Sequence, residues 1–141
     1  MCEDKKSCIT INCGCCDNGG STAENVYSSE ETVCGKWIDG KPIYRKVIEG
    51  KLSATSGKMY KFADVSGLNI ERMIDLRGNF IGDSNKSHLT IQTSYNTPGG
   101  LSAAVNMWYN TEEKAILYHL LDNGGGYSNC TAYVVIEYTK Q

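Results

Sequence analysis

The Asp-Gly pair at residues 39 and 40 is the feature that most constrains how this chain can fold. Two short apolar runs flank it, at residues 33–38 and 43–47. An Asp-Gly pair between two such runs is the strongest short-range signal for a β-hairpin, because both residues tolerate the backbone angles of a tight turn. The sequence therefore predicts two antiparallel strands near residue 40.

Similar short runs, separated by Gly, Asn and Asp, continue from residue 26 to the end of the chain. We expect strands near residues 32–38, 42–48, 58–64, 69–76, 87–95, 101–109, 114–121 and 130–139. We expect turns at residues 39–41, 96–100, 110–113 and 122–128. This spacing predicts an all-β fold, an antiparallel β-sandwich or open barrel of about eight strands.

Alternation of apolar and polar side chains supports two of these strands. One face of the strand at residues 87–95 carries Leu89, Ile91, Thr93 and Tyr95. One face of the last strand carries Ala132, Val134, Ile136 and Tyr138. The opposite face of that strand also carries Tyr133 and Val135, so we expect it to be central or covered by another subunit.

Residues 1–26 form a separate, Cys-rich and irregular N-terminal extension, followed by one β domain at residues 27–141. The cysteines of the extension are Cys2, Cys8, Cys13, Cys15 and Cys16. Three interpretations stay open: free thiols packed against a partner, disulfides, or a zinc site built from Cys8, Cys13, Cys15 and Cys16. The spacing lacks paired C-x-x-C knuckles, so the sequence favours an anchoring segment without metal.

Charge and composition exclude several function classes. The formal net charge of -2 provides no basic surface for nucleic acid. We expect no membrane insertion and no secretion signal, because no apolar run reaches the required length. The two histidines, His88 and His119, have no evident nucleophile partner, and residues 122–126 lack the Lys-Ser/Thr of a phosphate loop. We therefore expect neither an enzyme nor a cofactor.

Three segments carry a resemblance to a known family. Residues 27–31 read YSSEE, residues 37–44 read WIDGKPIY, and residues 130–140 read CTAYVVIEYTK. In this order they resemble the C-terminal domain of phage and prophage fibre proteins and of minor virion structural proteins. The resemblance covers residues 26–141, and the first 25 residues have no counterpart in it.

The resemblance implies a phage virion structural protein, made in the bacterial cytoplasm and located in the virion. Because the chain is too short for a long fibre shaft, we expect a head fibre or capsid decoration protein. Its N-terminal segment would bind capsid or other virion proteins, and its β domain would form a homo-oligomer, a trimer in preference to a dimer. One alternative is a tail-fibre tip that binds a receptor or host glycan. Another is a small thiol or metal protein.

Two local predictions accompany this interpretation. Residues 110–121 could form a helix capped by Asn110 or Thr111, but the resemblance places a hairpin there, with residues 115–121 as the return strand. Aromatic residues near strand ends or loops are the candidate receptor contacts. These are Tyr95, Trp108, Tyr109 and Tyr127, with core packing as the alternative for Trp108.

Overall fold

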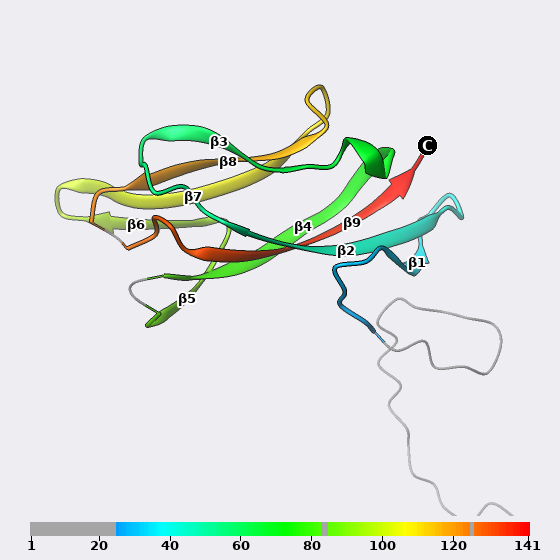
Figure 1. Cartoon of the computed structure of the whole chain (residues 1–141), viewed down its shortest axis with the longest axis horizontal. Helices are drawn as coiled ribbons and strands as arrows, with labels where there is room; N and C mark the ends of the chain where they lie inside the picture. Colours follow the sequence, from blue (N-terminus) through cyan, green and yellow to red (C-terminus); the bar gives the residue numbers. More distant parts are fainter. Residues whose placement is uncertain (1–24, 83–84, 125) are drawn as a thin grey trace, which may run out of the picture.

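The computed structural model describes residues 25–82, 85–124 and 126–141. Within these ranges the chain is all-β, with two antiparallel sheets that face each other as a β-sandwich (Figure 1). The first sheet contains, in spatial order, β1 (Thr32–Lys36), β2 (Pro42–Lys51), β9 (Thr131–Lys140), β4 (Ile70–Gly82) and β5 (Ser87–Thr90). The second contains β3 (Lys58–Asp64), β8 (Ala115–Asp122), β7 (Gly100–Asn110) and β6 (Thr93–Thr97). A short 3₁₀ turn, Ser66–Leu68, connects β3 to β4.

The hydrophobic core lies between the two sheets and is built from alternate residues of their strands. The first sheet contributes Phe80, Ala132, Val134, Ile136 and Tyr138, all 0% exposed. The second contributes Ala103, Val105, Ile116 and Leu120, also 0% exposed. The predicted inward face of the last strand is therefore confirmed.

The Asp-Gly hairpin is confirmed, although its first strand ends two residues earlier than predicted. β1 ends at Lys36, and the backbone N–H of Trp37 donates to the carbonyl of Lys41 over 2.8 Å. Gly40 has a φ of 89°, and its N–H donates to the carbonyl of Trp37 over 2.8 Å. These bonds describe a tight turn followed by a left-handed glycine, the usual three-residue hairpin loop.

The last strand, β9, lies at the centre of the five-stranded sheet, between β2 and β4 (Figure 1). Gly78 of β4 permits this close pairing, since a Cβ there would lie 2.1 Å from the carbonyl oxygen of Tyr133. On the outer face of β9, Tyr133 is 43% exposed and Val135 is half-buried. The central position predicted for this strand is confirmed.

The predicted strand at residues 87–95 is wrong as a single element. The chain leaves the first sheet after β5 and enters the second sheet as β6, with Ile91 buried at the crossing. The N–H of Ile91 donates to the carbonyl of Gly78 over 3.3 Å, which holds the crossing against β4. Because the strand is divided, Leu89 and Tyr95 belong to different sheets and do not share a face.

The helix considered at residues 110–121 is also absent: Ala115–Asp122 forms strand β8, paired with β3 and β7. Asn110 caps the preceding turn instead, because its Oδ1 accepts a hydrogen bond of 2.8 Å from the N–H of Glu113. The hairpin implied by the resemblance is the structure that forms.

Replacing a core side chain of β9 tests this packing. Ile136→Ala should lower the free energy of unfolding by about 2–5 kcal/mol, because it leaves a cavity between the sheets. Met59→Ala is the control, since Met59 is 58% exposed on β3, and should change stability by less than about 0.5 kcal/mol. Urea unfolding followed by circular dichroism measures both. Equal losses in the two variants would contradict the burial of Ile136.

Candidate functional site

The four aromatic residues predicted to contact a receptor do not form one surface. Tyr95 on β6 is 54% exposed, and Trp108 and Tyr109 on β7 are half-buried. Because neighbouring strand residues point to opposite faces, Tyr109 packs against the core and Trp108 lies on the outer face of the sheet. The expectation that Tyr127 is exposed is wrong. It is 6% exposed, and its ring packs edge-on against Phe80 at 5.3 Å.

The cysteines predicted to serve in anchoring, Cys2, Cys8, Cys13, Cys15 and Cys16, lie outside the described residues. In the described part of the chain, Cys34 is buried in β1, and Cys130 immediately precedes β9. The thiol of Cys130 donates to the carbonyls of Gly126 at 3.3 Å and Ser128 at 3.5 Å. Burial, followed by the nearby charge of Asp122, raises the pKa of Cys130 and keeps the thiol protonated.

The structure instead brings the two ends of the domain together through polar contacts on both faces of β9, around Glu137 on the outer face and around Tyr138 on the inner face. The segment at residues 25–31 leads into β1, and it contacts side chains of β2, β4 and β9. We call this set of contacts the entry clasp. Its members are Asn25, Tyr27, Glu31, Arg45, Arg77, Glu137, Tyr138 and Lys140.

Arg45 is the centre of the entry clasp. Its guanidinium group donates to Oε1 of Glu137, from Nε at 2.8 Å and from Nη2 at 2.7 Å. The leading segment approaches from the other side: Arg45 also donates to Oδ1 of Asn25, and the ring of Tyr27 lies 4.7 Å from Cζ of Arg45. Arg45 is only 8% exposed, and these partners compensate for its burial.

Arg77 of β4 completes the pairing of Glu137 from the other neighbouring strand. Its Nη2 lies 3.1 Å from Oε1 of Glu137, and its Nη1 donates to Asp75. Burial alone would lower the pKa of Arg77, but hydrogen bonds with Tyr27, Glu137 and Asp75 raise it overall. Glu137 on the central strand β9 is therefore paired with an arginine from each neighbouring strand, β2 and β4.

Glu31 makes the second connection between the leading segment and β9. Its carboxylate accepts hydrogen bonds from Oη of Tyr138 and from Nζ of Lys140, the latter at 2.5 Å. Nζ of Lys140 also lies 4.6 Å from the ring centre of Tyr44, which stacks on Tyr138. Burial, followed by the bond to Glu31 and its charge, raises the pKa of Tyr138 strongly. The hydroxyl therefore stays protonated as a donor.

The polar groups of the entry clasp hold the leading segment and three strands together. Its two carboxylates are paired with Arg45, Arg77 and Lys140, and Asp75 outside the clasp pairs with the remaining charge of Arg77. Sequence reasoning missed Arg45 and Glu137. Arg45 is one of four charged residues of β2 and has no distinguishing signal, whereas Glu137 is the one acidic residue of a mostly apolar β9 and could have been singled out. Elsewhere, His88 and His119 are exposed on different sheets. Among the residues that the structure describes, no three His, Cys, Asp or Glu side chains form a metal-binding group.

Comparisons with family models, curated proteins and solved structures give no match to the chain. Within the described ranges, the structure contains no helix of the length and apolarity needed to span a membrane.

Removing Arg45 tests the clasp. Arg45→Ala should lower the free energy of unfolding by about 1–3 kcal/mol, because the half-buried carboxylate of Glu137 loses two hydrogen bonds. Lys41→Ala is the control, since the pair between Lys41 and Glu71 is exposed on both sides and should contribute less than about 1 kcal/mol. Denaturant unfolding measures both values. A loss for Arg45→Ala no greater than that for Lys41→Ala would refute the structural role of the pair.

Glu31 should make stability depend on pH. Burial alone would raise the pKa of Glu31, but hydrogen bonds from Lys140 and Tyr138 and the charges of Lys140 and Lys46 lower it below the ordinary value of 4.5. A carboxyl group whose pKa is lower in the folded state stabilises the fold above its unfolded pKa, and this contribution disappears as the pH falls through the folded pKa.

Unfolding measurements on the wild type and Glu31→Gln at a series of pH values test this prediction. The difference in unfolding free energy should be greatest near neutral pH and should shrink as the pH falls below 4.5. The same difference between about pH 7 and about pH 3 would mean that Glu31 does not gain its partners on folding.

Proposed function

We propose that the chain is a phage virion structural protein, a head fibre or capsid decoration protein in which residues 1–26 attach to the virion and the β domain projects from it. The entry clasp carries this proposal. It fixes the segment that follows the extension to the central strand through Glu31 and Arg45. A force applied to the extension would therefore be transmitted to the sheet, and the extension would fix the orientation of the β domain.

The resemblance adds a second line of support, because its outer motifs contact each other in the fold. The opening motif supplies Tyr27 and Glu31, and the closing motif supplies Glu137, Tyr138 and Lys140. Residues 37–44 form the hairpin loop and the beginning of β2, which carries Arg45. The residues of both motifs thus hold the leading segment against the sheet, and this role suits a structural protein.

The tail-tip alternative has less support. A receptor surface built from the predicted aromatic residues would need them on one face, whereas Tyr127 is in the core and Trp108 and Tyr109 face opposite ways. Tyr95 alone remains well exposed. The small thiol or metal protein depends on the N-terminal cysteines, which the structure does not describe.

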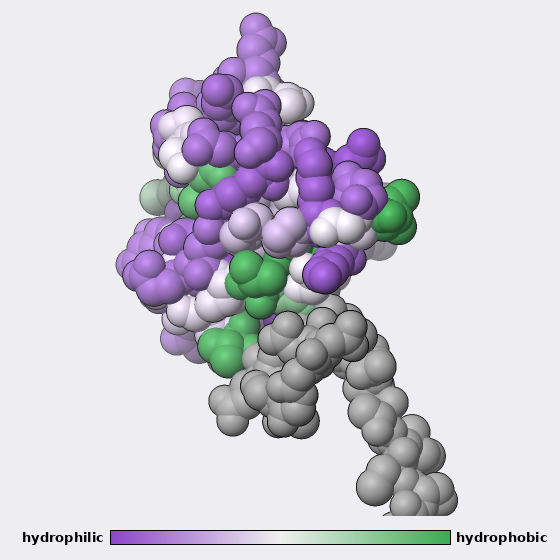
Figure 2. All heavy atoms as spheres, turned by 90° about the vertical axis from the view of Figure 1, so that its right-hand side faces the viewer, coloured by the Kyte–Doolittle hydropathy of each residue, from purple (hydrophilic) through white to green (hydrophobic). Residues whose placement is uncertain are grey.

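We also propose a homo-oligomer, a trimer or a dimer, assembled near the entry of the chain. Figure 2 shows apolar patches within a mostly polar surface at the end of the domain that carries the C-terminus. Exposed apolar side chains at this end include Val26 (46%), Val33 (63%) and Ile38 (91%). Val33 lies on β1, and among the described residues β1 is an edge strand whose outer side a second copy could pair with.

Labelling of phage particles tests the virion proposal. An antibody raised against residues 27–141 should label particles released from the strain that encodes the chain, at the head surface in electron micrographs. Added to particles that lack it, the full-length protein should co-sediment, and a variant without residues 1–24 should stay in the supernatant. The core and the clasp lie outside the deleted segment, so this variant should retain the fold.

Absence of the protein from purified particles, or equal co-sedimentation of the two forms, would contradict the proposal. Labelling confined to the tail tip would favour the receptor-binding alternative.

A further inference from the structure

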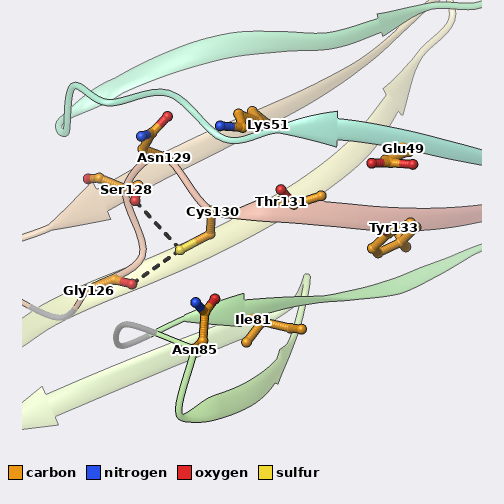
Figure 3. A pocket seen from close by; sticks show the side chains of 10 residues that line it. All are labelled: Glu49, Lys51, Ile81, Asn85, Gly126, Ser128, Asn129, Cys130, Thr131 and Tyr133. Carbon is orange, nitrogen blue, oxygen red and sulfur yellow. Dashed lines mark hydrogen bonds between the residues drawn. The ribbon is translucent and has the colours of Figure 1, made fainter.

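A polar pocket of about 580 Å³ lies on the outer face of the five-stranded sheet, at the end opposite the hairpin loop (Figure 3). None of the four aromatic residues predicted as receptor contacts lines it. Its walls come from β2, β4, β9 and the loops beside them. The lining residues are Glu49, Lys51, Ile81, Asn85, Gly126, Ser128, Asn129, Cys130, Thr131 and Tyr133.

The loop before β9 forms one wall of the pocket and is held by Asp122. The carboxylate Oδ2 of Asp122 accepts hydrogen bonds from the backbone N–H of Tyr127 at 3.1 Å and of Ser128 at 2.7 Å. The ring of Tyr127 is inserted into the core against Phe80. The wall is therefore fixed before any ligand arrives, which reduces the entropic cost of binding.

The opposite side of the same loop is held by the chain that follows β2. The N–H of Leu52 donates to the carbonyl of Cys130 over 2.8 Å, and the N–H of Asn129 donates to the carbonyl of Ser53 over 2.9 Å. These bonds use backbone groups and leave the side chain of Asn129 to line the pocket, as Figure 3 shows.

The floor of the pocket combines an aromatic ring with two opposite charges. Glu49 lies directly across from Tyr133 in the pairing of β2 with β9, and Lys51 lies across from Thr131. Tyr133 is 43% exposed. Within the described part of the chain, neither the carboxylate of Glu49 nor the ammonium group of Lys51 has an ion-pair partner. Both remain available to a ligand.

We propose that this pocket binds a neutral saccharide unit. An exposed tyrosine ring offers an apolar face to the C–H groups of a sugar ring, as amphipathic aromatic side chains do at binding surfaces. Carboxylate, ammonium, amide and hydroxyl groups around such a ring supply both acceptors and donors for sugar hydroxyls. These groups come from Glu49, Lys51, Asn85, Ser128, Asn129 and Thr131.

The charge of the pocket disfavours other ligand classes. Among the described lining residues the charges of Glu49 and Lys51 cancel formally, so an anion such as a phosphate would meet a carboxylate as well as an ammonium group. An apolar ligand would cover unpaired charges without replacing their hydration. A neutral molecule rich in hydroxyl groups satisfies both side chains. This site goes beyond the structural role proposed above, and its test does not depend on virion location.

Titration of the full-length ¹⁵N-labelled protein with sugars, followed by NMR, tests the proposal. The probes are glucose, galactose, N-acetylglucosamine, maltose, lactose and chitobiose, each up to about 20 mM, because a small open site is expected to have a Kd of about 1 mM. At least one probe should shift the amide signals of Lys51, Thr131 and Tyr133. Glycylglycine serves as a zwitterionic comparison probe, since it too could pair with both charges.

Three variants separate this pocket from the rest of the surface. Tyr133→Ala should weaken binding about five- to tenfold by removing the stacking face. Glu49→Gln keeps the shape of the side chain and should weaken binding at least about threefold. Tyr95→Ala is the matched control, because Tyr95 is 54% exposed on β6 and does not line the pocket. It should bind as the wild type does.

Saturable shifts at the pocket that both pocket variants reduce would support the proposal. Three results would overturn it: no shift with any of the sugars, shifts centred away from the pocket, or shifts with glycylglycine alone. Should Tyr133→Ala lose its fold, unchanged binding by Glu49→Gln would by itself overturn the assigned role of the carboxylate.

Discussion

The central strand β9 is the constraint on which the rest of the structure depends. It pairs along its length with β2 on one side and β4 on the other, and its inward side chains are fully buried. Since the side-chain period of a strand is two residues, a shift of one residue would expose every core side chain of β9. Glu137 and Tyr133 would move to the inner face in the same shift. The core, the entry clasp and the pocket therefore share one register.

The entry clasp shows how a small domain can hold a terminal segment without a large apolar contact. Tyr27 is 54% exposed, so its burial contributes little. Partly buried charges are retained in a fold only when they are paired and hydrogen-bonded. Arg45 and Glu137 satisfy this condition through each other and through Arg77. Asn25 and Tyr27 add a hydrogen bond and a cation–π contact to Arg45, so the sheet supplies the polar partners that hold the leading segment.

Features that depend on neighbouring residues could be predicted from the sequence. The Asp-Gly hairpin and the inward face of β9 are encoded by turn chemistry and alternation. The change of sheet at Ile91 could not be predicted, because a strand that continues and one that crosses to another sheet have the same alternation. The pairing of Arg45 with Glu137 depends on the register of strands far apart in the chain. Tyr127 is buried although it lies in a Gly-rich loop, because Asp122 turns that loop inward.

Hydrogen exchange at the amide of Val47 tests most directly whether the leading segment is part of the folded sheet. Its N–H donates to the carbonyl of Ser28 over 2.8 Å, beyond the end of the β1 pairing. If the segment is fixed to the domain, this amide should exchange as slowly as the amides of β9, through global unfolding. Exchange of Val47 at the rate of an unprotected amide, with β9 still protected, would show that the segment is detached and would contradict the account.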